Sequence, residues 1–224
     1  MQDFSLASPA GVVLSLDAVL ILLLALACLG SKLFDRYLTY YGLQSVLLAV
    51  AAGTAAFVER DPALWILAVL TLVLKGIAIP TAARRLLVRR LQLKRDVATI
   101  VGPSTSLILG AVLAGFAYLV IGPQHLAHGL IAASIIPIST AVILIGALTM
   151  VIRRHMVAQL LGWLIMENGV FLGGITLTAS FPFIVEAGIF FDLIAGFLIM
   201  LAMTTGLAES LTTTLAGRQR REPT

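Results

Sequence analysis

The sequence has very little cysteine. Cys28 is the only one among 224 residues, which excludes a disulfide framework and a thiolate metal cluster built within the chain. The sequence also presents no helix with a spaced pair of histidines of the kind that holds haem. We therefore predict no cofactor and no metal site in this chain.

Charged residues are also scarce. They make up 12% of the chain, whereas soluble domains carry roughly a quarter, and 60% of the residues are hydrophobic. The mean hydropathy is +1.06. This composition leaves too little polar surface for a soluble domain, so we expect an all-α integral membrane protein. The net charge of +4 does not indicate nucleic-acid binding, because the basic residues fall in short connections between apolar runs.

Long apolar runs account for most of the chain. A membrane-spanning helix needs about 20 mostly apolar residues, and seven stretches qualify: about 12–30, 39–58, 62–82, 97–121, 129–151, 156–178 and 184–208. The N-terminus "MQDFSLASPAG" carries Asp3 and no Lys or Arg, whereas a signal peptide begins with positive charge. We therefore interpret the first run as a retained helix rather than a cleaved leader.

The basic residues set a predicted orientation. With seven spans, one set of connections and the C-terminal tail share one side of the membrane and hold 13 basic residues: Lys32, Arg36, Arg84, Arg85, Arg89, Arg90, Lys94, Arg95, Arg153, Arg154, Arg218, Arg220 and Arg221. The opposite connections hold only Arg60. Because cytoplasmic loops are enriched in Lys and Arg, we expect the N-terminus outside and the C-terminus in the cytoplasm.

Several residues suggest local features of these spans. Pro103 and Pro137 are expected to kink the fourth and fifth spans. Tyr40 and Tyr41 open the second span and fit an aromatic belt at the membrane surface, and Asp17 lies close enough to the outer end of the first span to be interfacial.

Three ionisable residues lie deep within predicted spans. Lys75 follows "LTLVL", Glu167 lies near the middle of the sixth span, and Asp192 lies within the seventh. A charge at mid-bilayer costs about 3 kcal/mol on insertion scales, so such groups normally face protein or water and commonly serve proton or ion transfer. The alternative is that they only fix helix packing through hydrogen bonds, worth about 0.6–2 kcal/mol each in membranes.

Helical spacing in the sixth span separates two faces. One stripe permits close packing against a neighbouring helix and consists of Gly162, Met166, Gly169 and Gly173. Glu167 points elsewhere, on the side of Trp163, Phe171 and Gly174. Asn168 follows Glu167 directly, and we expect its amide to orient water or a backbone group.

These residues resemble a known family. "RRHMVAQLLGWLIMENGVFLGG", Arg153 to Gly174, looks like the second helix of subunit K of respiratory complex I, which has a basic pair followed by a glycine and a membrane carboxylate. The wider chain is most similar to hydrogenase-4 component E, a larger relative, in its length, in "LVLK" followed by a basic loop, and in "MENG". The resemblance to subunit K covers about residues 129–210. It therefore divides the chain into a four-helix region (1–128), a three-helix region (129–210) and a basic tail (211–224).

The resemblance implies a function. Component E is a non-catalytic membrane subunit that lies between antiporter-like subunits and an electron-transfer arm and lends a carboxylate to a proton path. Asp192, with Gly196 four residues on, matches the acidic residue of the small subunit's third helix. The carboxylate of its second helix would fall at Leu164, so Glu167 is displaced by three residues, which is less than one helical turn. Nickel–iron and iron–sulfur sites are then expected in partner subunits, in a prokaryotic inner membrane.

Three interpretations of function remain open at this point. In the first, Glu167 carries a proton, Lys75 modulates it or passes protons on, and Asp192 is the next station. In the second, the chain is a passive anchoring or assembly scaffold of the same complex. In the third, it is a subunit of a cation/proton antiporter complex without hydrogenase.

Overall fold

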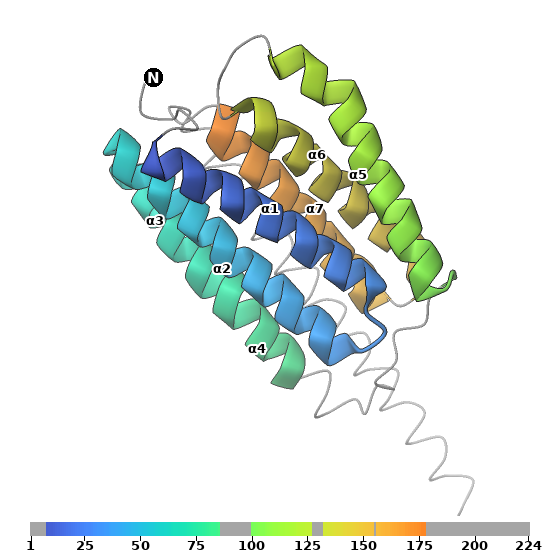
Figure 1. Cartoon of the computed structure of the whole chain (residues 1–224). Coiled ribbons are helices and arrows are strands. Elements are labelled where there is room, and N and C mark those ends of the chain that lie inside the picture. Colours follow the sequence, from blue (N-terminus) through green and yellow to red (C-terminus); the bar gives the residue numbers. More distant parts are fainter. Residues whose placement is uncertain (1–7, 86–99, 127–131, 155, 178–224) are drawn as a thin grey trace, which may run out of the picture.

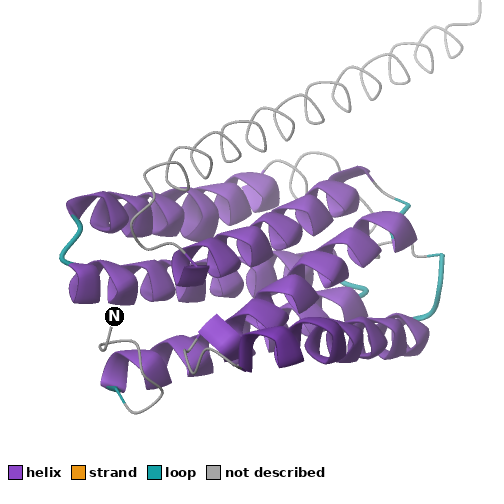
Figure 2. Ribbon diagram, turned by 90° about the horizontal axis from the view of Figure 1, so that it is seen from above, coloured by secondary structure: helices purple, strands orange, loops and turns teal. Residues whose placement is uncertain are grey.

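The computed structural model describes residues 8–85, 100–126, 132–154 and 156–177, and within these ranges every regular element is a helix (Figures 1 and 2). The helices are α1 (Pro9–Gly30), α2 (Phe34–Glu59), α3 (Pro62–Leu70), η2 (Thr71–Ala78), α4 (Ile79–Ala83), α5 (Pro103–Leu126), α6 (Ala132–Ile152) and α7 (Met156–Leu177). Because α3, η2 and α4 run on without a break, the described residues contain six helices long and apolar enough to cross a membrane.

The prediction of an all-helical, membrane-type chain is therefore confirmed for the first six spans. The predicted seventh span (184–208), with Asp192 and Gly196, lies outside the described residues, as does the tail 211–224.

Polar residues and prolines mark where helices begin. Ser8 accepts a hydrogen bond from the backbone N–H of Gly11 at the start of α1, and Asp61 accepts one from Ala63 at the start of α3. Both caps are followed directly by a proline, which fits the first helical position because no N–H is needed there. Pro103 is likewise the first residue of α5, where a proline does not kink the helix, so the expectation that it kinks the fourth span is wrong. Pro137 does lie inside α6.

The helices form two rows. The first contains α1, α2 and the third span, and the second contains α5, α6 and α7, with α1 packed on α5 and α6 and α2 packed on α7 (Figure 1). The view from above shows the helices running roughly side by side along the bundle (Figure 2). The interior between the rows is where α2, the third span and α7 can place side chains against one another.

Glycines bring α6 and α7 into close contact. A Cβ atom placed on Gly169 would lie 2.8 Å from the backbone nitrogen of Ile143, and one on Gly173 would lie 2.9 Å from the hydroxyl oxygen of Ser139. A Cβ atom on Gly162 would lie 3.0 Å from the carbonyl oxygen of Gly146. The predicted small-residue stripe therefore does pack against a neighbouring helix, and it leaves the other side of α7 for the polar site.

A buried arginine joins the ends of α1 and α6. The Nη2 atom of Arg153 donates to the backbone carbonyls of Cys28, Leu29 and Ser31 at 3.2, 2.9 and 2.9 Å, and its guanidinium lies 5.4 Å from the centre of the Tyr37 ring. Burial lowers the pKa of Arg153 from its ordinary value. A cation at the C-terminus of a helix also complements the helix dipole.

The described basic residues of the connections, apart from Arg60, lie at this same end of the bundle. The backbone N–H of Ile100 donates to the carbonyl of Ile152, and Arg84 pairs with Asp35 at 3.1 Å. The α1–α2 turn, the end of α4 and the α6–α7 junction thus lie together, while Arg60 lies in the α2–α3 turn at the other end (Figure 1).

Candidate functional site

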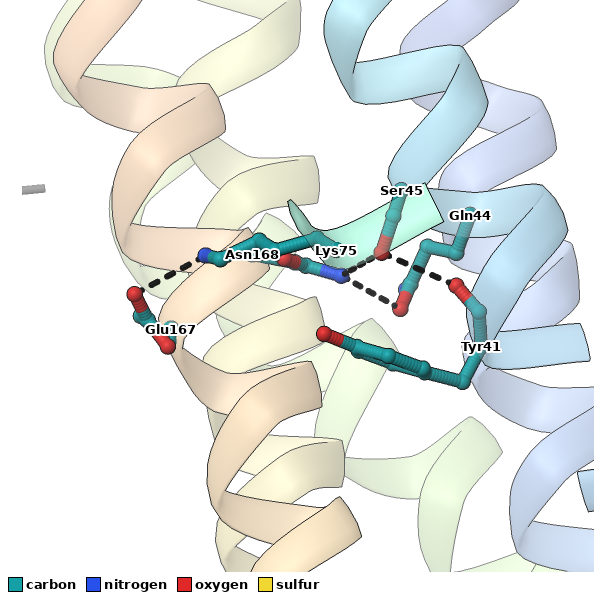
Figure 3. A network of polar contacts seen from close by, with 6 residues as sticks. All are labelled: Tyr41, Gln44, Ser45, Lys75, Glu167 and Asn168. Atoms are coloured by element: carbon teal, nitrogen blue, oxygen red, sulfur yellow. Dashed lines mark hydrogen bonds and ion pairs between the residues drawn. The ribbon is translucent and has the colours of Figure 1, made fainter. Parts of the chain in front are cut away.

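The centre of the site is an ion pair between two residues that are 92 positions apart in sequence. The Nζ atom of Lys75 lies 2.8 Å from Oε1 of Glu167, and the two residues are only 1% and 6% exposed. Lys75 comes from η2 and Glu167 from α7, so the pair bridges the two rows of helices (Figure 3). Both charges are therefore shielded from lipid, as the sequence predicts for ionisable groups within spans.

Lys75 lies in a short π-helix. A turn of π-helix holds about one more residue than a turn of α-helix. Such helices are rare in proteins and occur often at functional sites. Pro80 lies five residues after Lys75 and has no N–H to donate to the preceding turn. The hydroxyl of the next residue, Thr81, donates to the carbonyl of Ile77 at 2.6 Å. The widened turn holds Lys75 on the inner side of the third span.

Glycines also let the third span approach α2 closely. A Cβ atom on Gly42 would lie 3.3 Å from Cγ of Pro80, and one on Gly76 would lie 3.3 Å from Cγ2 of Val46. Because the two helices touch here, Lys75 and the polar residues of α2 are brought to the same level of the bundle.

Asn168 extends the site from the ion pair to α2. Its Oδ1 atom accepts a hydrogen bond from Nζ of Lys75 at 3.4 Å. Its Nδ2 atom donates to Oε1 of Gln44 at 3.2 Å and to the hydroxyl of Ser45 at 3.4 Å. Asn168, Gln44 and Ser45 are all fully buried, and their polar groups bond to one another (Figure 3).

The network ends on backbone carbonyls. Nε2 of Gln44 donates to the carbonyl of Ile21 in α1 at 3.1 Å, and the hydroxyl of Ser45 donates to the carbonyl of Tyr41 at 3.0 Å. Residues from α1, α2, η2 and α7 are therefore joined at one point in the interior.

Aromatic rings border the ion pair. The Phe171 ring lies one turn after Glu167, with its centre 5.8 Å from Nζ of Lys75, close enough for a favourable cation–π contact. The ring of Tyr41 lies beside the network with its hydroxyl directed toward α7 (Figure 3). The predicted placement of Phe171 on the face of Glu167 agrees with this contact.

The structure brings together three of the predicted site residues and separates others. Lys75, Glu167 and Asn168 meet in one network, whereas Gly169 and Gly173 face α6 on the other side of α7. Asp192 and Gly196 lie outside the described residues. In the described residues Asn168 bonds to the side chains of Lys75, Gln44 and Ser45, whereas water or a backbone group was expected as its partner.

Two residues of the network were missed by the sequence analysis. Gln44 and Ser45 are fully buried polar residues in α2. Tyr41 is also fully buried, so the expectation that it belongs to an aromatic belt at the membrane surface is wrong. The signal that could have found them was a glutamine and a serine side by side within a run that is otherwise apolar. Asp17 is likewise buried, at 4% exposure on the inner face of α1.

The two groups at the centre of the arrangement are an acid and a base in direct contact. A carboxylate and an ammonium this close each favour the charged form of the other. Among the described residues, no three His, Cys, Asp or Glu side chains converge in a way that could hold a metal ion.

Comparison with known proteins gives one distant relative. The chain is 26% identical over 161 residues to "Uncharacterized protein Rv0085" of Mycobacterium tuberculosis, an alignment that covers 72% of this chain and 73% of that protein. No protein-family profile matches the chain, and no solved structure matches it.

Proposed function

We propose that the chain is a non-catalytic membrane subunit of a hydrogenase-4 or complex I-like oxidoreductase and takes part in proton translocation coupled to electron transfer. The observation that carries this proposal is the Lys75–Glu167 ion pair, with its oxygen and nitrogen 2.8 Å apart and both residues buried among apolar helices. The resemblance of "LVLK" and "MENG" to component E supports it, because those two motifs contain the two members of the pair.

Glu167 is the proposed proton carrier. It can release its proton while the ammonium of Lys75 stabilises the carboxylate, and it can take one up when a proton arrives from a neighbouring group. Lys75 modulates this exchange or passes protons on, and Asp192 in the predicted seventh span is the proposed next station. Electron transfer takes place in partner subunits, which hold the nickel–iron and iron–sulfur sites of such a complex.

The proposed setting is the cytoplasmic membrane of a prokaryote. Seven spans with the N-terminus outside would place the basic connections in the cytoplasm, and their meeting at one end of the bundle, near Arg153 and Arg84, supports this orientation. Antiporter-like membrane subunits of the same complex are the proposed neighbours within the bilayer.

A passive scaffold is the second candidate. Its support is that the network around Asn168 ties α1, α2, η2 and α7 together, as a purely structural set of hydrogen bonds would.

Glu167→Gln separates the two candidates, because glutamine keeps hydrogen bonding but cannot exchange a proton. We expect the E167Q complex to assemble and to lose most proton translocation in inverted membrane vesicles. The matched control is D35N, the same change in the exposed acid that pairs with Arg84, which should leave translocation unchanged. Full translocation by the assembled E167Q complex would favour the scaffold.

The partners are tested by purifying the tagged chain in mild detergent and identifying its companions by mass spectrometry. Nickel-site and iron–sulfur subunits among the companions would support the oxidoreductase. Antiporter subunits without them would instead support a cation/proton antiporter complex.

A further inference from the structure

The hydrogen bonds around Asn168 have a fixed direction. The carbonyl of Ile21 can only accept, so Gln44 must turn its NH₂ group toward α1, and its oxygen is left facing Asn168. The carbonyl of Tyr41 likewise takes the hydroxyl hydrogen of Ser45, so the hydroxyl oxygen accepts from Asn168. The two backbone carbonyls thus determine which group donates and which accepts in the bonds from Asn168 to Gln44 and Ser45.

This direction determines which atom of Asn168 faces Lys75. Two acceptors in α2 hold the Nδ2 atom of Asn168, which leaves its oxygen directed at Nζ of Lys75. The orientation does not depend on Lys75, because Gln44 and Ser45 would hold it in any case. The oxygen is therefore a preorganised acceptor for the ammonium.

We propose that Gln44, Ser45 and Asn168 are positioning residues that keep Lys75 charged when Glu167 takes up a proton. This inference rests on the proposed role of Glu167 as proton carrier. The ammonium lies 2.8 Å from the carboxylate and 3.4 Å from the amide oxygen. The carboxylate thus holds it in the ionised state, and the amide oxygen is an acceptor that keeps its position when the acid is neutral.

The proposal follows from the cost of burying a cation. An ammonium taken out of water without acceptors tends to lose its proton, and Lys75 is only 1% exposed. A neutral amide oxygen with a fixed position lowers that cost, and the Phe171 ring adds a favourable contact. Besides Lys75, the ionisable side chains at the network include Glu167 and Tyr41, and Asp17 is buried on the inner face of α1 one turn before Ile21.

The same network keeps protons from leaving through α1. Amides do not take up protons at ordinary pH, and the bonds end on the carbonyls of Ile21 and Tyr41. The branch through Asn168 therefore supports the charge on Lys75 and does not conduct protons.

The charge of Lys75 can be read directly by nuclear magnetic resonance, because the ammonium and amine forms of lysine have well-separated nitrogen resonances. The chain has three lysines, Lys32, Lys75 and Lys94, so isotope labelling of lysine gives three side-chain signals. K75M identifies the signal that belongs to the site. E167Q imitates the neutral acid, and we expect Lys75 to remain an ammonium in this variant near neutral pH.

Removing the amide in the E167Q background tests the positioning role. E167Q/N168L is expected to lower the ratio of ammonium to amine at Lys75, because the oxygen of Asn168 is removed. E167Q/Q44M/S45A keeps Asn168 but removes its two acceptors, and it should lower the ratio of ammonium to amine about fivefold, the effect of one net hydrogen bond. The matched control is E167Q/V170A, which changes an exposed side chain of the same helix and should behave as E167Q.

These nitrogen resonances test the proposal without any measurement of proton transport. An amine at Lys75 already in E167Q would overturn it, as would an ammonium that persists unchanged in both amide variants. Because no translocation is measured, the proposed proton path can fail in its own assay while the charge of Lys75 still follows the amide network. If N168L does not fold, the Q44M/S45A variant gives the answer alone.

Discussion

At the scale of single residues, Lys75 and Glu167 depend on each other. Each is a charge within an apolar helix, at a cost of about 3 kcal/mol if left alone, and each neutralises the other at 2.8 Å. Breaking a buried pair by removing one partner is strongly destabilising, whereas replacing both with apolar residues is often neutral or favourable. The contribution of the pair to stability can therefore be measured separately from its proposed role in proton transfer.

K75M and E167L are each expected to lower the free energy of unfolding by about 3 kcal/mol, because each leaves one buried charge without its counter-ion. The double variant K75M/E167L should return to within about 1 kcal/mol of the natural protein. Thermal unfolding of the purified chain in detergent measures all three. A double variant as unstable as the sum of the two single variants would show that the pair does not interact as described.

The residues that the sequence could identify were those with the largest cost of burial. Lys75 and Glu167 stand out because a formal charge within an apolar run needs an explanation. Gln44 and Ser45 did not stand out, because neutral polar side chains in a membrane helix are common and can bond to their own backbone. Their role depends on which face of α2 meets Asn168, and that face is fixed by tertiary packing.

At the scale of elements, close helix contacts decide which face of α7 is free for chemistry. Gly169 presses on α6 so closely that an added Cβ atom would lie 2.8 Å from the backbone nitrogen of Ile143 and 2.9 Å from the carbonyl oxygen of Ser139. Backbone atoms cannot move aside as a flexible side chain can. The position of Glu167 on the opposite side follows from this contact.

Gly169→Ala is expected to push α6 and α7 apart and to lower the free energy of unfolding by about 1–3 kcal/mol. The matched control is Gly115→Ala in α5, where an added Cβ atom meets nothing within 4 Å. That change should be neutral or stabilising by up to about 1 kcal/mol, because alanine favours the helix. Thermal unfolding of both variants tests the contact, and equal midpoints would contradict it.

Helix existence was predictable from hydropathy, but helix ends were less so. The first six predicted spans correspond to helices, yet α2 begins at Phe34, before the predicted 39, and α5 begins at Pro103, after the predicted 97. Polar residues such as Asp35 and Arg36 continue a helix beyond its apolar part, so hydropathy alone places such an end too late. The π-helix around Lys75 has no signal in hydropathy at all.

At the scale of the whole molecule, the two ends of the bundle differ in their charged residues. The described basic residues of the connections, apart from Arg60, lie at one end, where Arg153 binds the end of α1. The other end has Arg60 between the acidic residues Glu59 and Asp61 in the turn from α2 to α3. A membrane protein oriented by its basic residues would place the Arg153 end in the cytoplasm.

Cysteine labelling tests this orientation with little background, because the natural Cys28 is fully buried. Arg60 and Arg154 are both exposed, and a membrane-impermeant maleimide should label R60C in intact cells but R154C only after permeabilisation. The side of the membrane on which a reporter fused after Thr224 lies tests the number of spans. Seven spans place this reporter in the cytoplasm, on the same side as R154C. A reporter on the same side as R60C would mean an even number of crossings. That result would contradict the predicted span 184–208, and with it the proposed role of Asp192 on the proton path.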